Sequence, residues 1–134
     1  ILHPQGEEPP PSPPPSGLQV LLLDGNWGES AAMSRTVVGW GRRIALPMTG
    51  TSRYWLRAQR ELDEFSTVEA LIFVFGYLGL AREQAALQLQ LELHVYAGLL
   101  SRGRKTEAAR YLGASPVGAA FPDLLAKLAP QIPP

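Results

Sequence analysis

Short apolar runs separated by turn residues organise the first half of the chain. Residues 18–23 read Leu-Gln-Val-Leu-Leu-Leu and stop at Asp24-Gly25, a pattern that predicts a buried strand followed by a turn. A helix is expected over about residues 29–38, and a second short strand over residues 43–46, closed by Pro47. Polar residues at the carboxyl end of a buried strand are a usual place for a ligand site in α/β folds.

Helical patterns dominate from residue 66 onward. Ser66-Thr67-Val68-Glu69 is a capping box that predicts the start of a helix, and the apolar residues after it predict a largely buried helix reaching about Leu80. Residues 87–95 alternate between apolar and polar positions as a strand does, but their Leu, Gln and Glu content favours a helix. The helices expected in this region are residues 82–101, 105–112 and 122–129, which make 82–134 mainly helical.

Length and composition predict a single domain over residues 1–134. Nearly half of the 134 residues are apolar, which is enough to bury a core, and residues 9–17 form a proline-rich stretch expected to be an exposed loop. The chain has no cysteine, which excludes disulfides, thiol nucleophiles and cysteine metal sites. His3 and His94 lack ligand partners at metal-site spacing, so no metal is expected. The apolar runs are too short to cross a bilayer, and a cytoplasmic location is expected.

Charge is unevenly distributed along a chain whose formal net charge is zero. Residues 1–34 carry four acids and no base, whereas residues 35–60 carry six arginines and no acid. These arginines are Arg35, Arg42, Arg43, Arg53, Arg57 and Arg60. Such a block can form a local phosphate-binding surface on a neutral protein, or a solvated surface that happens to be basic. The two interpretations are equally balanced on charge alone.

Asp24-Gly25-Asn26-Trp27 is the most distinctive short motif. Asp24 stands where a strand is expected to end, Gly25 permits a tight turn, and Trp27 offers a flat apolar plane for a base or a cofactor ring. The alternative is that the aspartate caps the next helix and the tryptophan packs beneath it. Chemistry alone favours this alternative.

Five motifs in order resemble the DTW-domain family. The family carries Asp-x-Thr-Trp at the end of an apolar strand, followed by a helix with a Met, a Leu-Pro, a Tyr-x-Leu-Arg segment and a Ser-Thr-Leu-Glu-Ala helix start. The corresponding residues here are Asp24-Gly25-Asn26-Trp27, Met33, Leu46-Pro47, Tyr54-Trp55-Leu56-Arg57 and Ser66-Thr67-Val68-Glu69-Ala70, with Ile1-Leu2-His3-Pro4 similar to a further family segment. The resemblance covers about residues 1–100. Two departures are Asn26 in place of the family's Thr and the lack of the cysteine-bearing segment with which the family usually begins.

The resemblance implies both a fold and an activity. The expected fold is α/β and SPOUT-like, with a knotted sheet flanked by helices and a helical C-terminal part. The implied reaction transfers the 3-amino-3-carboxypropyl group of S-adenosylmethionine to N3 of a uridine in tRNA, which leaves methylthioadenosine. The implied cofactor is therefore S-adenosylmethionine and the implied partner is tRNA, with no membrane partner expected.

The resemblance also implies roles for individual residues. Asp24 is the candidate base for the uridine N3 proton, Trp27 is expected to stack on the uracil or the cofactor, and Glu69 is a weaker candidate base. Candidate cofactor-binding residues are Leu46, Pro47, Tyr54, Ser66, Thr67 and Glu69, and candidate RNA-binding residues are Arg35, Arg42, Arg43, Arg53 and Arg57. Arg57 can hold either the carboxylate of the transferred group or a tRNA phosphate. The rival interpretation is a non-catalytic RNA-binding or helical interaction module.

Overall fold

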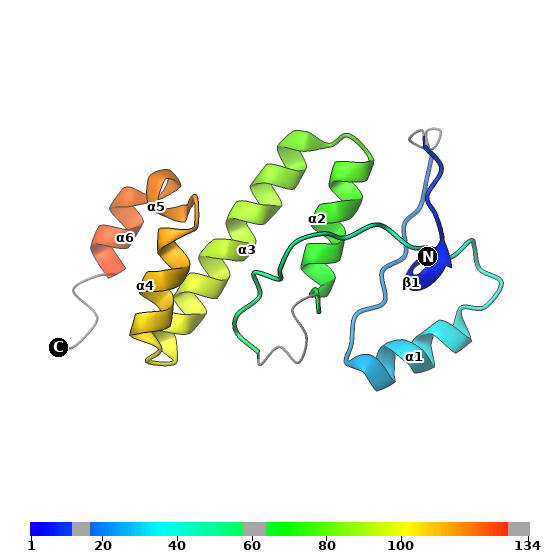
Figure 1. Cartoon of the computed structure of the whole chain (residues 1–134), viewed down its shortest axis with the longest axis horizontal. Coiled ribbons are helices and arrows are strands. Elements are labelled where there is room, and N and C mark those ends of the chain that lie inside the picture. Colours follow the sequence, from blue (N-terminus) through cyan, green and yellow to red (C-terminus); the bar gives the residue numbers. More distant parts are fainter. Residues whose placement is uncertain (12–16, 58–63, 129–134) are drawn as a thin grey trace. The chain divides into compact units, whose positions relative to one another are not determined.

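The chain is mostly helical (Figure 1). The computed structural model describes residues 1–11, 17–57 and 64–128, in which one strand precedes six helices. In chain order these are β1 (Leu2–Glu7), α1 (Trp27–Thr36), α2 (Thr67–Tyr77), α3 (Ala81–Ser101), α4 (Lys105–Gly113), α5 (Val117–Ala120) and α6 (Pro122–Leu128). Two compact units divide the chain: unit 1 is residues 1–50 with 66–84, and unit 2 is residues 51–65 with 85–134. None of the described helices has both the length and the apolar character needed to span a bilayer.

The expected sheet is the main correction to the sequence prediction. Residues 18–23 form no strand, although the Leu2 amide donates a hydrogen bond of 3.0 Å to the Leu21 carbonyl. In the second predicted strand, Ile44 forms only isolated parallel bridges to Leu2 and Glu7. A strand needs a ladder of backbone hydrogen bonds to a neighbour, and apolar composition does not supply one. The described residues hold one strand and no sheet, which does not fit a knotted SPOUT-like sheet.

Helix α1 confirms the predicted helix, with its start two residues earlier than expected. Asn26 is the N-cap: its Oδ1 accepts a hydrogen bond of 3.0 Å from the Glu29 amide, and Glu29 Oε2 accepts one of 2.9 Å from the Asn26 amide. This reciprocal pair satisfies two amides that the first helical turn leaves without partners. The chain then turns at Gly39, whose φ of +85° favours glycine.

Helix α2 confirms the capping box that the sequence predicts. Ser66 accepts from the Glu69 amide at 3.3 Å, and Glu69 accepts from the Ser66 amide at 2.7 Å. The helix buries Ile72 and Val74, whereas Val68 is exposed. The helix ends at Tyr77, three residues before the predicted end near Leu80.

Helix α3 settles the ambiguity of the alternating segment 87–95 in favour of a helix. Leu91, Val95 and Leu99 are buried on one side at four-residue spacing, as expected for a helix that faces a core. The fully buried side chains of unit 2 include Val95, Leu99, Ala108, Tyr111 and Val117. Gly98 lets Leu56 approach the helix, because a Cβ atom at this position would stand 2.7 Å from Leu56 Cδ2.

A left-handed glycine separates α3 from α4. Gly103 has φ +72°, and the Arg104 amide donates to the Leu99 carbonyl at 3.0 Å, which ends α3 at this glycine. Arg104 then directly precedes α4. Arg104 also pairs with Glu107. The hydrogen bond between their side chains lowers the pKa of Glu107 below its ordinary value of 4.5 and raises the pKa of Arg104.

The proline-rich loop predicted over 9–17 lies partly outside the described residues. In its described part, Pro9, Pro10 and Pro11 have no regular secondary structure. The Tyr77 hydroxyl donates a hydrogen bond of 2.9 Å to the Pro10 carbonyl, which ties this loop to the end of α2.

Candidate functional site

Two of the five sequence motifs meet in unit 1. The Thr67 hydroxyl donates a hydrogen bond of 2.6 Å to Asp24 Oδ1, across 43 positions of sequence. This distance is typical of a hydroxyl bonded to a charged carboxylate. Thr67 opens α2, so the Asp24 carboxylate lies at the positive end of the dipole of that helix. The structure thus brings the candidate base together with one candidate cofactor-binding residue.

The turn around Asp24 explains why this aspartate is not a helix cap. The cap of α1 is Asn26, two residues later, so the Asp24 carboxylate is available to Thr67. Gly25 is required by close packing, because a Cβ atom there would stand 2.9 Å from Glu29 Cβ and 3.2 Å from Met33 Cε. The Asp-Gly-Asn order therefore places an exposed carboxylate immediately before a capped helix.

Glu69 is held inside the cap of α2. Glu69 is 5% exposed, and its Oε2 accepts hydrogen bonds from the Ser66 amide at 2.7 Å and the Ser66 hydroxyl at 2.9 Å. These contacts stabilise the first turn of α2 beside Thr67. Ser66 and Glu69 thus position the residue that contacts Asp24, and a role for either in cofactor binding stays a prediction.

The other candidate cofactor residues lie in different parts of the chain. Leu46 is half-buried and Pro47 is exposed in a loop of unit 1, where the Met48 amide donates to the Leu46 carbonyl at 2.8 Å. Tyr54 is half-buried in unit 2, and its amide donates to Ser52 Oγ at 3.2 Å. Their contribution to a shared pocket stays a prediction.

Trp27 is the first residue of α1. Its side chain lies outside the described part of the structure, so stacking on a uracil or cofactor ring stays a prediction. The backbone position of Trp27 is described: the residue directly follows the Asn26 cap and comes three residues after Asp24.

Comparison with family models, curated proteins and solved structures finds no match to this chain. The family resemblance therefore rests on the motifs themselves, and two of these motifs are joined by the contact between Asp24 and Thr67.

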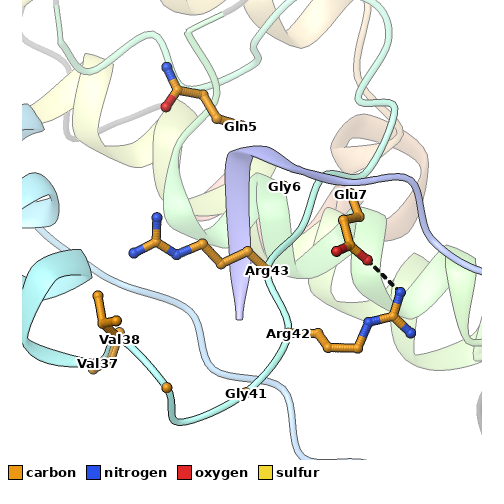
Figure 2. Close-up of a pocket in the computed structure, with 9 residues that line it drawn as sticks. Gln5, Gly6, Glu7, Val37, Val38, Gly41, Arg42 and Arg43 are labelled. Atoms are coloured by element: carbon orange, nitrogen blue, oxygen red, sulfur yellow. Dashed lines mark hydrogen bonds and ion pairs between the residues drawn. The ribbon is translucent and has the colours of Figure 1, made fainter.

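Three of the candidate RNA-binding arginines lie in unit 1. Arg35 is exposed in the last turn of α1, and Arg42 Nη2 lies 2.6 Å from Glu7 Oε2 in an ion pair whose two side chains are each 69% exposed. Arg43 Nη2 donates to the Ser34 carbonyl at 3.0 Å. Arg42 and Arg43 line an open pocket of about 500 Å³ together with residues of β1 and of the turn after α1. Figure 2 shows their side chains and the ion pair between Arg42 and Glu7.

The other two candidate arginines lie in unit 2. Arg53 Nη2 is 3.2 Å from Glu92 Oε2 and donates to the Tyr111 carbonyl at 3.1 Å, with its guanidinium 3.9 Å from the centroid of the Tyr111 ring. Arg57 is exposed, and its Nη2 is 3.5 Å from the Glu64 carbonyl. These contacts give Arg53 a structural role, and contact with RNA by either arginine stays a prediction. Arg60 lies outside the described residues.

Sequence reasoning missed two features of this region. The Asn26-x-x-Glu29 capping box has a visible signature, a cap residue followed three positions later by Glu. Trp40, 73% exposed, stands between two glycines and close to the arginine block, and this arrangement is also visible in the sequence. Among the described residues, no group of three or more His, Cys, Asp or Glu side chains is placed to hold a metal ion.

Proposed function

We propose that this chain belongs to an enzyme that transfers the 3-amino-3-carboxypropyl group of S-adenosylmethionine to N3 of a tRNA uridine. The observation that carries the proposal is the 2.6 Å hydrogen bond from Thr67 to Asp24, which joins two motifs of the DTW resemblance. The knotted SPOUT-like sheet is not part of the proposal, because the described residues hold a single strand.

The chemistry of the reaction suits an oriented carboxylate. Uridine N3–H is a weak acid, and a carboxylate that accepts its proton assists attack by N3 on the activated carbon beside the sulfonium. Thr67 binds one oxygen of Asp24 and leaves the other to accept a proton, while the exposed position gives a substrate access. Attack at one of three activated carbons then depends mainly on how the cofactor is oriented.

The positive end of α2 also suits an anionic part of the cofactor. The first turn of a helix presents backbone amides and favours negative charge, such as the carboxylate of the aminocarboxypropyl group. In the proposal, the backbone amide of Thr67 contributes to this binding, whereas the amide and hydroxyl of Ser66 are donated to Glu69, which keeps the helix start in place.

A second candidate function is a non-catalytic RNA-binding or helical interaction module. The observation that favours it is the architecture of unit 2, in which α3 to α6 form a helical unit with its own buried core. Such a module binds RNA or a partner without consuming the cofactor. An assay that detects the aminocarboxypropyl group in RNA distinguishes such a module from the proposed enzyme.

Calorimetry tests the cofactor part of the proposal. We expect S-adenosylmethionine to bind the folded protein with a measurable heat. Thr67→Val keeps the side-chain shape but removes the hydroxyl, whose proton is bonded to Asp24 and whose oxygen is proposed to accept a hydrogen bond from the cofactor ammonium. We expect it to weaken binding by about fivefold, the equivalent of that one hydrogen bond.

The matched control is Thr106→Val, which removes an exposed hydroxyl from the first turn of α4 and should leave cofactor binding unchanged. Circular dichroism establishes that each variant is folded. Absence of any binding heat with folded wild-type protein would contradict the cofactor assignment.

A further inference from the structure

Trp40 is the most exposed of the large apolar residues that the structure shows at the surface. It is 73% exposed and its neighbour Val38 is 66% exposed, whereas the other exposed large apolar residues lie between 38% and 48%. Tryptophan is usually well buried because its large ring gains most from leaving water. An indole exposed to this extent, close in sequence to an exposed valine, is a candidate contact surface for a ligand.

The turn that carries Trp40 is anchored at both ends. The Trp40 amide donates to the Val37 carbonyl at 3.1 Å, and the Val37 side chain is buried. Gly39 has φ +85° and open space around it, so the backbone turns sharply just before the indole. On the far side, Arg43 donates to the Ser34 carbonyl. The Trp40 ring is therefore presented by a fixed turn.

Two exposed arginines lie close to Trp40 in the sequence. Arg35 lies five residues before Trp40 and Arg42 two residues after it, and both are exposed. Arg42 pairs with Glu7 at 2.6 Å, but both side chains are 69% exposed, and exposed ion pairs contribute little free energy. A phosphate can therefore replace Glu7 as the partner of Arg42.

We propose that residues 35–43, the Trp40 turn, bind an unpaired nucleotide of RNA. Trp40 stacks on the base, and Arg35 and Arg42 pair with the flanking phosphates. An aromatic plane beside arginines suits single-stranded RNA, because every base has a face to stack and every nucleotide carries a charge. The inference rests on the proposed function only in taking RNA as the partner.

The first test follows the indole directly. The probe is a labelled oligouridylate of about ten nucleotides, within the usual site size for a single strand. We expect it to quench the intrinsic tryptophan fluorescence and to bind about tenfold more weakly to Trp40→Ala, measured by anisotropy of the label. Trp40→Phe should lose the quenching but keep most of the affinity, because phenylalanine also stacks. Leu124→Ala, at an exposed position of α6, is the matched control and should behave as wild type.

The second test uses salt. For Arg42→Gln we expect weaker binding and a logarithmic salt slope shallower by about 0.7, the value for one lost phosphate contact on a single strand. For Glu7→Gln we expect the affinity for oligouridylate to rise by up to about fivefold, because the Glu7 carboxylate no longer competes with phosphate for Arg42. Arg82→Gln removes an exposed charge elsewhere in unit 1 and should leave the slope unchanged.

These titrations contain no S-adenosylmethionine, so a failure of the cofactor proposal leaves them interpretable. Unchanged affinity and unchanged quenching in Trp40→Ala would overturn the inference. It would equally be overturned if Trp40→Ala separated a self-associated protein into monomers while oligouridylate bound as before, since the turn would then be a contact between copies of the chain.

Discussion

Asp24→Asn is expected to lower aminocarboxypropyl transfer to tRNA by about 100-fold or more, which corresponds to the loss of a general base. The substitution keeps the shape of the side chain. It also keeps an Oδ1 atom that can accept the hydrogen bond from Thr67. What it removes is the capacity to take up the N3 proton of uridine. Initial rates with saturating tRNA and S-adenosylmethionine measure the effect.

The affinity of Asp24→Asn for S-adenosylmethionine shows whether the variant has lost only its proton acceptor or also the structure of the site. We expect the affinity of Asp24→Asn for S-adenosylmethionine to change much less than its turnover. Asp123→Asn is the matched control, because Asp123 is an exposed aspartate at the start of α6 and should retain full activity. Turnover of Asp24→Asn equal to that of wild type would remove Asp24 from the mechanism.

Arg53→Ala is expected to lower the free energy of unfolding by about 3–5 kcal/mol, because it leaves the buried Glu92 carboxylate without its ion-pair partner. The side chain of Glu92 is 6% exposed, and that of Arg53 is 21% exposed. The same substitution removes the stacking of the guanidinium on Tyr111 and its bond to the Tyr111 carbonyl. Thermal unfolding should show a midpoint lower by about 10–20 °C.

Two further variants identify the origin of that loss. Arg110 lies over the Trp55 ring at 5.0 Å but is itself exposed, so Arg110→Ala should cost only about 0.5–1 kcal/mol. Adding Glu92→Gln to Arg53→Ala removes the unpaired charge and should restore part of the stability. If Arg53→Ala costs no more than Arg110→Ala, the buried ion pair does not stabilise unit 2 as described.

Local signals in the sequence predicted five of the six described helices, whereas the four-residue helix α5 was not predicted. The capping box at Ser66 fixed the start of α2, because both of its hydrogen bonds involve residues within three positions of each other. Residues 87–95 show the limit of periodicity, since their alternation also fits a helix once the whole of α3 is considered. In both cases the deciding interactions are within one helix.

Strands could not be predicted in the same way. Residues 18–23 have the composition of a buried strand, but composition does not show whether a distant segment will pair with them along their length. β1 shows the converse, because the sequence around Gln5 and Gly6 has little strand character, yet the structure makes it the one strand described. Its contacts with a distant segment, such as the hydrogen bonds of Glu7 with Arg43 and Ala45, become visible only in the structure.

The sequence motifs name candidate site residues, but not the contacts between them. The motifs singled out Asp24 and Thr67, while the hydrogen bond between them spans 43 positions and becomes visible only in the structure. Arg53 belongs to a basic block that the family resemblance assigns to RNA, but its ion pair with Glu92 joins residues 39 positions apart. Charge distribution along a sequence does not reveal which charges are paired within the fold.

The most direct test of the central claim is the fate of label from S-adenosylmethionine. The protein, in its full reading frame, is incubated with unmodified tRNA and with cofactor labelled either in the methionine-derived chain or in the methyl group. We predict that label from the methionine-derived chain enters RNA and that nucleoside analysis shows a uridine heavier by one aminocarboxypropyl group. Transfer of methyl label alone would contradict the reaction assignment, and RNA binding without transfer of either label would favour the non-catalytic module.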